Sequence, residues 1–223
     1  MTKEILVIAP HPDDETLGMG GTILKHKGKG DHVHWLIVTN INPDHGWEKD
    51  IVVARQSEIQ KVAEKYEFSS VHKLDYPTTR LDEYPLRKLI NSVSTIINLV
   101  KPDTIYLPNR SDIHSDHRIT FDMVMACTKS FRYPFIRRLL MYETLSETEF
   151  TPALPEKLFA PNIFVDISEY IEQKIEVIQI YKSEVMVAPL PRSLESIRAL
   201  SLYRGSRIGV KAAEAFQLIF ERL

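Results

Sequence analysis

The chain has 223 residues, of which 43% are hydrophobic and 26% charged, and its formal net charge is −2. These values are ordinary for a globular protein with one sizeable core, and the near-neutral charge excludes the basic surface that nucleic-acid binding requires. The single cysteine, Cys127, excludes an internal disulfide and a cysteine-based zinc site. No apolar run is long enough for a signal peptide or a membrane span, so we expect a cytoplasmic protein.

The first half of the chain alternates between short apolar runs and amphipathic segments. Residues 4–9 form a β-branched apolar run that Pro10 ends, which is typical of a buried parallel strand. We expect further strands at 33–39, 71–74 and 104–107, and helices at 15–29, 50–66 and 84–100. This alternation predicts right-handed crossovers and a mostly parallel sheet with helices on both faces.

The second half of the chain is less regular. It suggests helices at 116–129, 168–181 and 193–203, and strands at 139–142 and 162–165. The prolines between 152 and 191 mark loops without a change of composition that would indicate a domain boundary. We therefore predict a single Rossmann-like α/β domain over residues 1–223.

The first group of chemically active residues follows the first strand, where His11, Asp13, Asp14 and Glu15 begin a helix. Ligands of an open parallel sheet bind beyond the carboxyl ends of its strands. The spacing of His11 and Asp14 lets a turn aim both side chains at one zinc ion, with Asp13 facing a metal-bound water. Alternatively, the acids only cap the helix. Adjacent carboxylates beside a histidine favour a site that holds a positive ion.

The second group, Asp112, His114, Asp116 and His117, follows the strand expected at 104–107. His117 can complete a His-Asp-His site for one zinc ion with an open fourth position. His114 can remain unligated, with Asp116 or another carboxylate holding it as an imidazolium that stabilises an oxyanion or protonates an amine. The alternative is a solvated polar loop. Two such groups at one edge of the sheet favour the metal site.

Three motifs carry a resemblance to a known family. They are the run APHPDDE at 9–15, the run LGMGGT at 17–22 and the run HSDHR at 114–118. With them the sequence resembles the LmbE-like, or PIG-L, family of zinc-dependent deacetylases. The resemblance implies that zinc is held by His11, Asp14 and His117, that Asp13 is the general base, that His114 supports the transition state, and that Asp116 orients His114.

The predicted substrate contacts are Arg55, Trp47 and Arg80. Arg55 and Glu58 resemble the family's Arg-x-x-Glu, and Trp47 lies in a loop after the second strand, where it can stack on a sugar or pack under the loop. Arg80 belongs to the loop at 76–82, which lacks the aspartate that many relatives carry after the proline.

The resulting hypothesis is a zinc hydrolase that removes an N-acetyl group from a sugar, a sugar nucleotide or a glycoconjugate. Relatives often form trimers or hexamers, so we expect a homo-oligomer. Two alternatives remain: a two-metal hydrolase acting on a phosphoester or another amide, and a metal-containing sugar- or nucleotide-binding module without hydrolytic activity.

Overall fold

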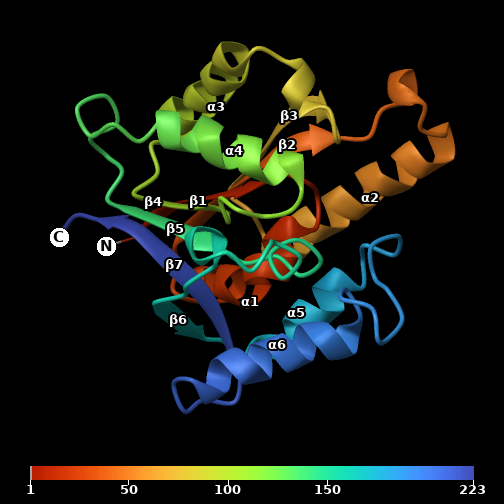
Figure 1. Cartoon of the computed structure of the whole chain (residues 1–223), viewed down its shortest axis with the longest axis vertical. Helices are drawn as coiled ribbons and strands as arrows, with labels where there is room; N and C mark the ends of the chain where they lie inside the picture. Colours follow the sequence, from red (N-terminus) through yellow and green to blue (C-terminus); the bar gives the residue numbers. More distant parts are fainter. Residues whose placement is uncertain (1) are drawn as a thin grey trace.

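The computed structural model describes residues 2–223, and one seven-stranded sheet in the order β3-β2-β1-β4-β5-β7-β6 lies at its centre (Figure 1). Its strands are β1 (Glu4–Ala9), β2 (His32–Asn40), β3 (Ser70–Pro77), β4 (Thr104–Pro108), β5 (Arg138–Tyr142), β6 (Ile163–Asp166) and β7 (Ala213–Glu221). The strands from β3 to β5 in this order are parallel, whereas β7 runs antiparallel to β5 and β6. The predicted mostly parallel α/β fold is confirmed.

Helices cover both faces of the sheet. They are α1 (Asp14–Gly28), α2 (Lys49–Tyr66), α3 (Leu86–Val100), α4 (Ser115–Ala126), α5 (Ile171–Ile178) and α6 (Leu194–Ser206). Ile5 and Val7 of β1 pack in one core with α1, α2, α5 and α6, whereas Leu6 and Ile8 pack in the other with α3 and α4 (Figure 1). Because successive side chains of a strand point to opposite faces, an uninterrupted apolar run requires cover on both sides.

The sequence did not predict β7, and a buried charge explains why. Glu214 interrupts the apolar pattern of this strand, yet it is only 4% exposed. Its carboxylate accepts hydrogen bonds from the backbone N–H groups of Gly21 (2.9 Å) and Thr22 (2.7 Å) and pairs with Lys174 Nζ at 2.7 Å. Partners from two other elements thus make this acid tolerable inside the sheet.

The same ion pair stabilises a break in α1. Met19 has non-helical angles (φ −153°, ψ 24°), and the chain forms two helical segments that meet there. Lys174 Nζ donates to the carbonyl of Leu17 at 2.9 Å, while Glu214 accepts from the amides that begin the second segment. The pair therefore satisfies backbone groups that the break leaves without helical partners.

The parallel strands direct their following loops to one edge of the sheet. His11 follows β1, residues 109–117 follow β4, and residues 143–148 follow β5. Both predicted groups therefore lie on the same edge. Among residues 2–223, we find no helix that combines the length and the apolar character needed to cross a bilayer.

We predict that Lys174→Met destabilises the protein by about 3–5 kcal/mol, because it leaves the Glu214 carboxylate buried without a cation. Urea unfolding monitored by circular dichroism measures this loss. The double variant Lys174→Met/Glu214→Gln should lose less than the single variant, since it removes the unpaired charge.

The matched control is Arg198→Met, which disrupts the ion pair with Glu172 at 2.6 Å on the surface. With side chains 38% and 61% exposed, this pair should contribute less than about 1 kcal/mol. Equal losses for the two single variants would contradict a special role for the buried pair.

Candidate metal centre and active site

A cavity of about 540 Å³ opens at the carboxyl ends of the parallel strands. The residues that line it come from the loops after β1 to β5, from α1 and α2, and from the segment between α5 and α6: His11, Pro12, Asp13, Asp14, Leu17, Thr39, Asn40, Ile41, Trp47, Ile51, Arg55, Thr78, Thr79, His114, Thr144, Ser146, Glu147, Ser183, Glu184 and Arg192. This is the place in an open parallel sheet where ligands bind.

His11, Asp14 and His117 converge at one end of this cavity. Asp14 Oδ2 lies 3.3 Å from His11 Nδ1 and 3.2 Å from His117 Nε2, and the three ligand atoms all lie within 4.8 Å of one another. The three residues come from the loop after β1, the start of α1 and the first turn of α4. The structure therefore brings together the three predicted ligands.

The other ring nitrogen of each histidine is held by a second carboxylate. His11 Nε2 lies 3.1 Å from Asp116 Oδ2, and His117 Nδ1 lies 2.9 Å from Asp112 Oδ2. Asp112 is itself fixed by Asn109 Nδ2 (2.8 Å) and Thr148 Oγ1 (2.7 Å). Carboxylates in these positions fix the ring orientation and leave His11 Nδ1 and His117 Nε2 free to bind a metal ion.

The residues present fit a divalent metal ion. His117 Nε2 is buried and has no hydrogen-bond partner within residues 2–223, which is costly for a polar atom unless a ligand binds it. His11, His114 and Asp116 form an overlapping group. That group is the weaker candidate because its Asp116 carboxylate already binds His11 Nε2 and the N–H of Thr79.

The charges around Asp14 also favour a cation at this position. Burial opposes ionisation of Asp14, but the positive charge of His117, followed by the contact with His11, holds the pKa of Asp14 well below the usual range. Burial likewise opposes protonation of His11, and hydrogen bonds to Asp116 and Asp14 nevertheless raise its pKa to about 9. An ion bound here would take the place of those protons.

Asp13 lines the cavity beside this cluster in an unusual backbone conformation, with φ 139°. It makes no side-chain cap to α1, which disfavours the simple helix-cap interpretation. Burial, and then the charges of Asp14 and Glu184, raise the pKa of Asp13 well above its usual value, while Arg192 Nη1, 3.5 Å away, opposes the shift. A carboxylate with a raised pKa is suited to accept and return a proton.

Glu15 supports Asp13 from behind the cavity. Its Oε2 accepts from the backbone N–H of Asp13 (3.1 Å), and its Oε1 accepts from Thr16 Oγ1 (2.6 Å) and Tyr181 OH (2.8 Å). Burial raises the pKa of Glu15 to about 7, against the lowering effect of these bonds. The sequence placed Glu15 within the motif but gave no indication of its partner Tyr181, which is distant along the chain.

His114 differs from the sequence-based expectation of an imidazolium paired with Asp116. Its Nδ1 accepts a hydrogen bond from the backbone N–H of Asp116 at 3.1 Å, so it caps α4 and carries its ring proton on Nε2. Burial, followed by the charges of His11 and His117, lowers the pKa of His114 to about 4. Asp116 therefore contacts His114 through its backbone N–H, whereas its carboxylate pairs with His11 Nε2 at 3.1 Å.

Two of the three predicted substrate contacts line the cavity, and one does not. Arg55 is buried and donates to the carbonyl of Pro12 at 2.9 Å, and Trp47 is 40% exposed at the mouth. Arg80 instead directs its side chain along the surface to Glu83, with two bonds of 2.7 Å. The prediction of Arg80 as a contact is therefore not supported, since it begins a short 3₁₀ turn and its nearest acid is three residues ahead.

The predicted site residues do not include several residues that shape the cavity. Glu184 and Arg192 enter from the segment between α5 and α6, and Thr144 and Glu147 enter from the loop after β5. The sequence places Asp112 in the second group but does not predict its hydrogen bond to His117. The only sequence signal for this bond is an acid five residues before a candidate ligand histidine.

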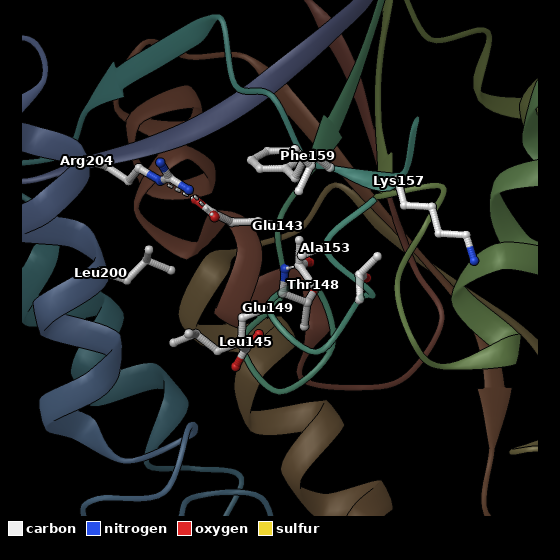
Figure 2. Close-up of a pocket in the computed structure, with 12 residues that line it drawn as sticks. Glu143, Leu145, Thr148, Glu149, Ala153, Lys157, Phe159, Leu200 and Arg204 are labelled. Carbon is white, nitrogen blue, oxygen red and sulfur yellow. Dashed lines mark hydrogen bonds and ion pairs between the residues drawn. The ribbon is translucent and has the colours of Figure 1, made fainter. Parts of the chain in front are cut away.

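A second hollow of about 330 Å³ is lined in part by residues of the loop after β5 (Figure 2). Glu143 and Arg204 point toward each other in it and form two hydrogen bonds of 2.8 and 2.6 Å, while Lys157 extends away. Thr144 lines both hollows. Glu143 and Arg204 are already paired, and the two groups of potential metal ligands found among the described residues lie elsewhere, so we assign the chemistry to the larger cavity.

The sequence matches the family model PIG-L, described as GlcNAc-PI de-N-acetylase, over residues 6–128. This match covers more than half of the chain, so the protein belongs to the PIG-L family. The matched range begins within β1, continues through β4 and includes the three converging residues.

Individual relatives agree with this assignment. The diacetylchitobiose deacetylase of Thermococcus kodakarensis is 25% identical to this chain, over 97% of this chain and 83% of its own length. The conserved protein TT1542 from Thermus thermophilus shares the fold, with a TM-score of 0.78, 24% identity and coverage of 100% and 97% of the two chains.

The fold by itself does not define one reaction. The 4-carboxy-2-hydroxymuconate hydratase GalB of Pseudomonas putida also superimposes, with a TM-score of 0.75, 18% identity and coverage of 100% and 98% of the two chains. A function for this chain must therefore be argued from its site.

We predict that Asp112→Asn weakens the binding of a divalent ion such as zinc by about 10–100-fold, because it removes the carboxylate that orients His117. Competition with a chromophoric chelator measures the affinity. Asp122→Asn is the matched control, since Asp122 is exposed on α4. An Asp112→Asn variant that binds the ion as tightly as this control would contradict the role of Asp112.

Proposed function

We propose that this protein is a zinc-dependent hydrolase that removes the N-acetyl group from an amino-sugar-containing substrate. The observation that carries the proposal is the buried, unpartnered His117 Nε2, which lies beside His11 and Asp14 with the high-pKa carboxyl of Asp13 next to them. Membership of the PIG-L family and the likeness to a diacetylchitobiose deacetylase support the same reaction.

His11, Asp14 and His117 would hold one zinc ion, for which imidazole and carboxylate are suitable ligands. When bound, zinc supplies a Lewis acid that activates water and polarises the acyl carbonyl. Asp116 and Asp112 keep the two histidine rings in the ligating orientation.

Asp13 acts as the general base and then as the general acid. It accepts a proton from the attacking water while the water oxygen bonds to the acyl carbon. When the C–N bond breaks, Asp13 delivers that proton to the departing nitrogen, so that acetate and a free amine result. The raised pKa of Asp13 suits the first step, because it makes the carboxylate a stronger base than an ordinary aspartate.

His114 stabilises the negative charge that develops on the acyl oxygen. Its ring lines the cavity at a centroid distance of 4.5 Å from His11, and its ring proton is on Nε2 because Nδ1 accepts from Asp116. A fixed neutral donor strengthens its hydrogen bond as the oxygen becomes more negative, which is the condition for lowering a barrier.

Arg55 and Trp47 form part of the wall against which the sugar binds. The proposal has three further parts. Residues 1–223 form a single domain, the protein assembles as a homo-oligomer (a trimer or a hexamer), and its location is cytoplasmic. Gel filtration with light scattering tests the assembly.

The competing hypothesis is a metal-containing sugar- or nucleotide-binding module without hydrolytic activity. It requires zinc ligands but no base. Glu15 accepts a hydrogen bond from the backbone N–H of Asp13 and so stabilises its unusual backbone conformation. This interaction favours the enzyme, since a carboxyl group that only faced solvent would not need to be held in place.

We predict that Asp13→Asn reduces kcat for acetate release from N-acetylated sugars by about 10²–10⁴-fold, since it removes the proton acceptor. Asparagine has the same shape as aspartate, so the packing around residue 13 should persist. Acetate is measured by a coupled assay, and zinc content by atomic emission.

Unchanged zinc content together with the loss of turnover is the expected result. Near-wild-type turnover by Asp13→Asn would refute the assignment of the base. Sugar binding without acetate release by the wild-type protein would favour the binding module.

A further inference from the structure

The part of a substrate that is not acylated must contact the outer wall of the cavity, where two arginines lie. Arg55 comes from α2 and Arg192 from the segment before α6, and both line the cavity. Their side chains are 10% and 21% exposed. If their charges were free, these arginines would make a site for a phosphate or a carboxylate.

Glu184 pairs with both arginines at once. Its Oε1 accepts a hydrogen bond from Arg55 Nη2, and its Oε2 lies 3.0 Å from Arg192 Nη1. Arg55 pairs in addition with Glu58 at 3.3 Å, and Arg192 lies 3.5 Å from Asp13. Neither guanidinium therefore presents an unpaired charge to the cavity.

The residues that line the cavity carry no net positive charge. Four carboxyl groups line the cavity, from Asp13, Asp14, Glu147 and Glu184, against two arginines. A divalent ion held by the His-Asp-His group would bring this lining close to neutrality. An anionic substituent would have to break the pairs of Glu184 or lie close to its carboxylate, and both are unfavourable.

The remaining surface suits an uncharged sugar. Trp47 and Ile51 line the cavity and are 40% and 43% exposed, so they offer an apolar surface for the face of a sugar ring. The paired guanidiniums still carry N–H donors for hydroxyl oxygens.

We propose that Glu184 is a specificity-determining residue, which makes this cavity select uncharged N-acetylated sugars against phosphorylated or nucleotide-linked ones. The proposal rests on the deacetylase function proposed above and narrows its substrate class.

The test compares two ligands that differ in charge next to the same sugar: methyl N-acetyl-β-glucosaminide and N-acetylglucosamine 1-phosphate. Isothermal titration gives the Kd of each for zinc-loaded wild-type protein, Glu184→Gln and the matched control Glu176→Gln. Glu176 is exposed on α5 and does not line the cavity, so this control makes the same change in net charge elsewhere.

We expect the wild-type protein and Glu176→Gln to bind the neutral ligand about tenfold more tightly than the phosphate, or better. Glu184→Gln should bind the phosphate at least about fivefold more tightly than the wild-type protein, because it frees a partly buried arginine charge. The gained affinity should fall as salt is added. Glu184→Asp keeps the carboxylate and should keep the preference, which controls for structural damage by the amide.

A wild-type protein that prefers the phosphate, a Glu184→Gln variant with an unchanged preference, or a neutral ligand that does not bind would each overturn the proposal. Acetate release from the same two ligands is measured separately. If the neutral ligand binds selectively but releases no acetate, the deacetylase function fails while the selectivity stands.

Discussion

Three consecutive carboxyl groups, those of Asp13, Asp14 and Glu15, are buried at the start of α1, and the rest of the site follows from the need to stabilise them. Three adjacent acids cannot all leave water without partners, because each ionised form is penalised by burial and by its neighbours. The fold meets this constraint by giving each acid a different environment. The pKa of Asp14 is lowered, whereas the pKa values of Asp13 and Glu15 are raised. Different environments for neighbouring acids are what separates a ligand from a base and from a supporting residue.

The partners of these acids come from distant parts of the chain. Asp14 meets His117 from α4, while Asp13 and Glu15 meet Arg192 and Tyr181 from the last third. The region that matches the family model ends at residue 128, so Arg192 and Tyr181, which contact Asp13 and Glu15, lie outside that region. The segment between α5 and α6 therefore both contacts Asp13, through Arg192, and lines the cavity.

A hydratase is among the structural neighbours of this chain, so the fold does not define the reaction. The function must be argued from the site. The parallel strands supply an edge on which loops meet, and this edge is compatible with several chemistries. The site supplies a buried imidazole nitrogen without a hydrogen-bond partner among residues 2–223, two carboxylates that fix the histidine rings and a strained aspartate. These features fit the metal-assisted hydrolysis proposed above.

The sequence by itself determined the strand–helix alternation, the edge at which both groups lie and the three converging residues His11, Asp14 and His117. Alternation depends on local periodicity, each group is a short contiguous motif, and parallel strands direct both groups to one edge. The tertiary structure decided what depends on long-range pairing. It made Glu214 a buried strand residue through Lys174, turned Asp116 from His114 to His11, and kept Arg80 on the surface with Glu83. It also brought Glu184 and Arg192 to the cavity. A charged side chain is described in sequence only by its type, and its charge is free or neutralised according to partners that folding alone brings within reach.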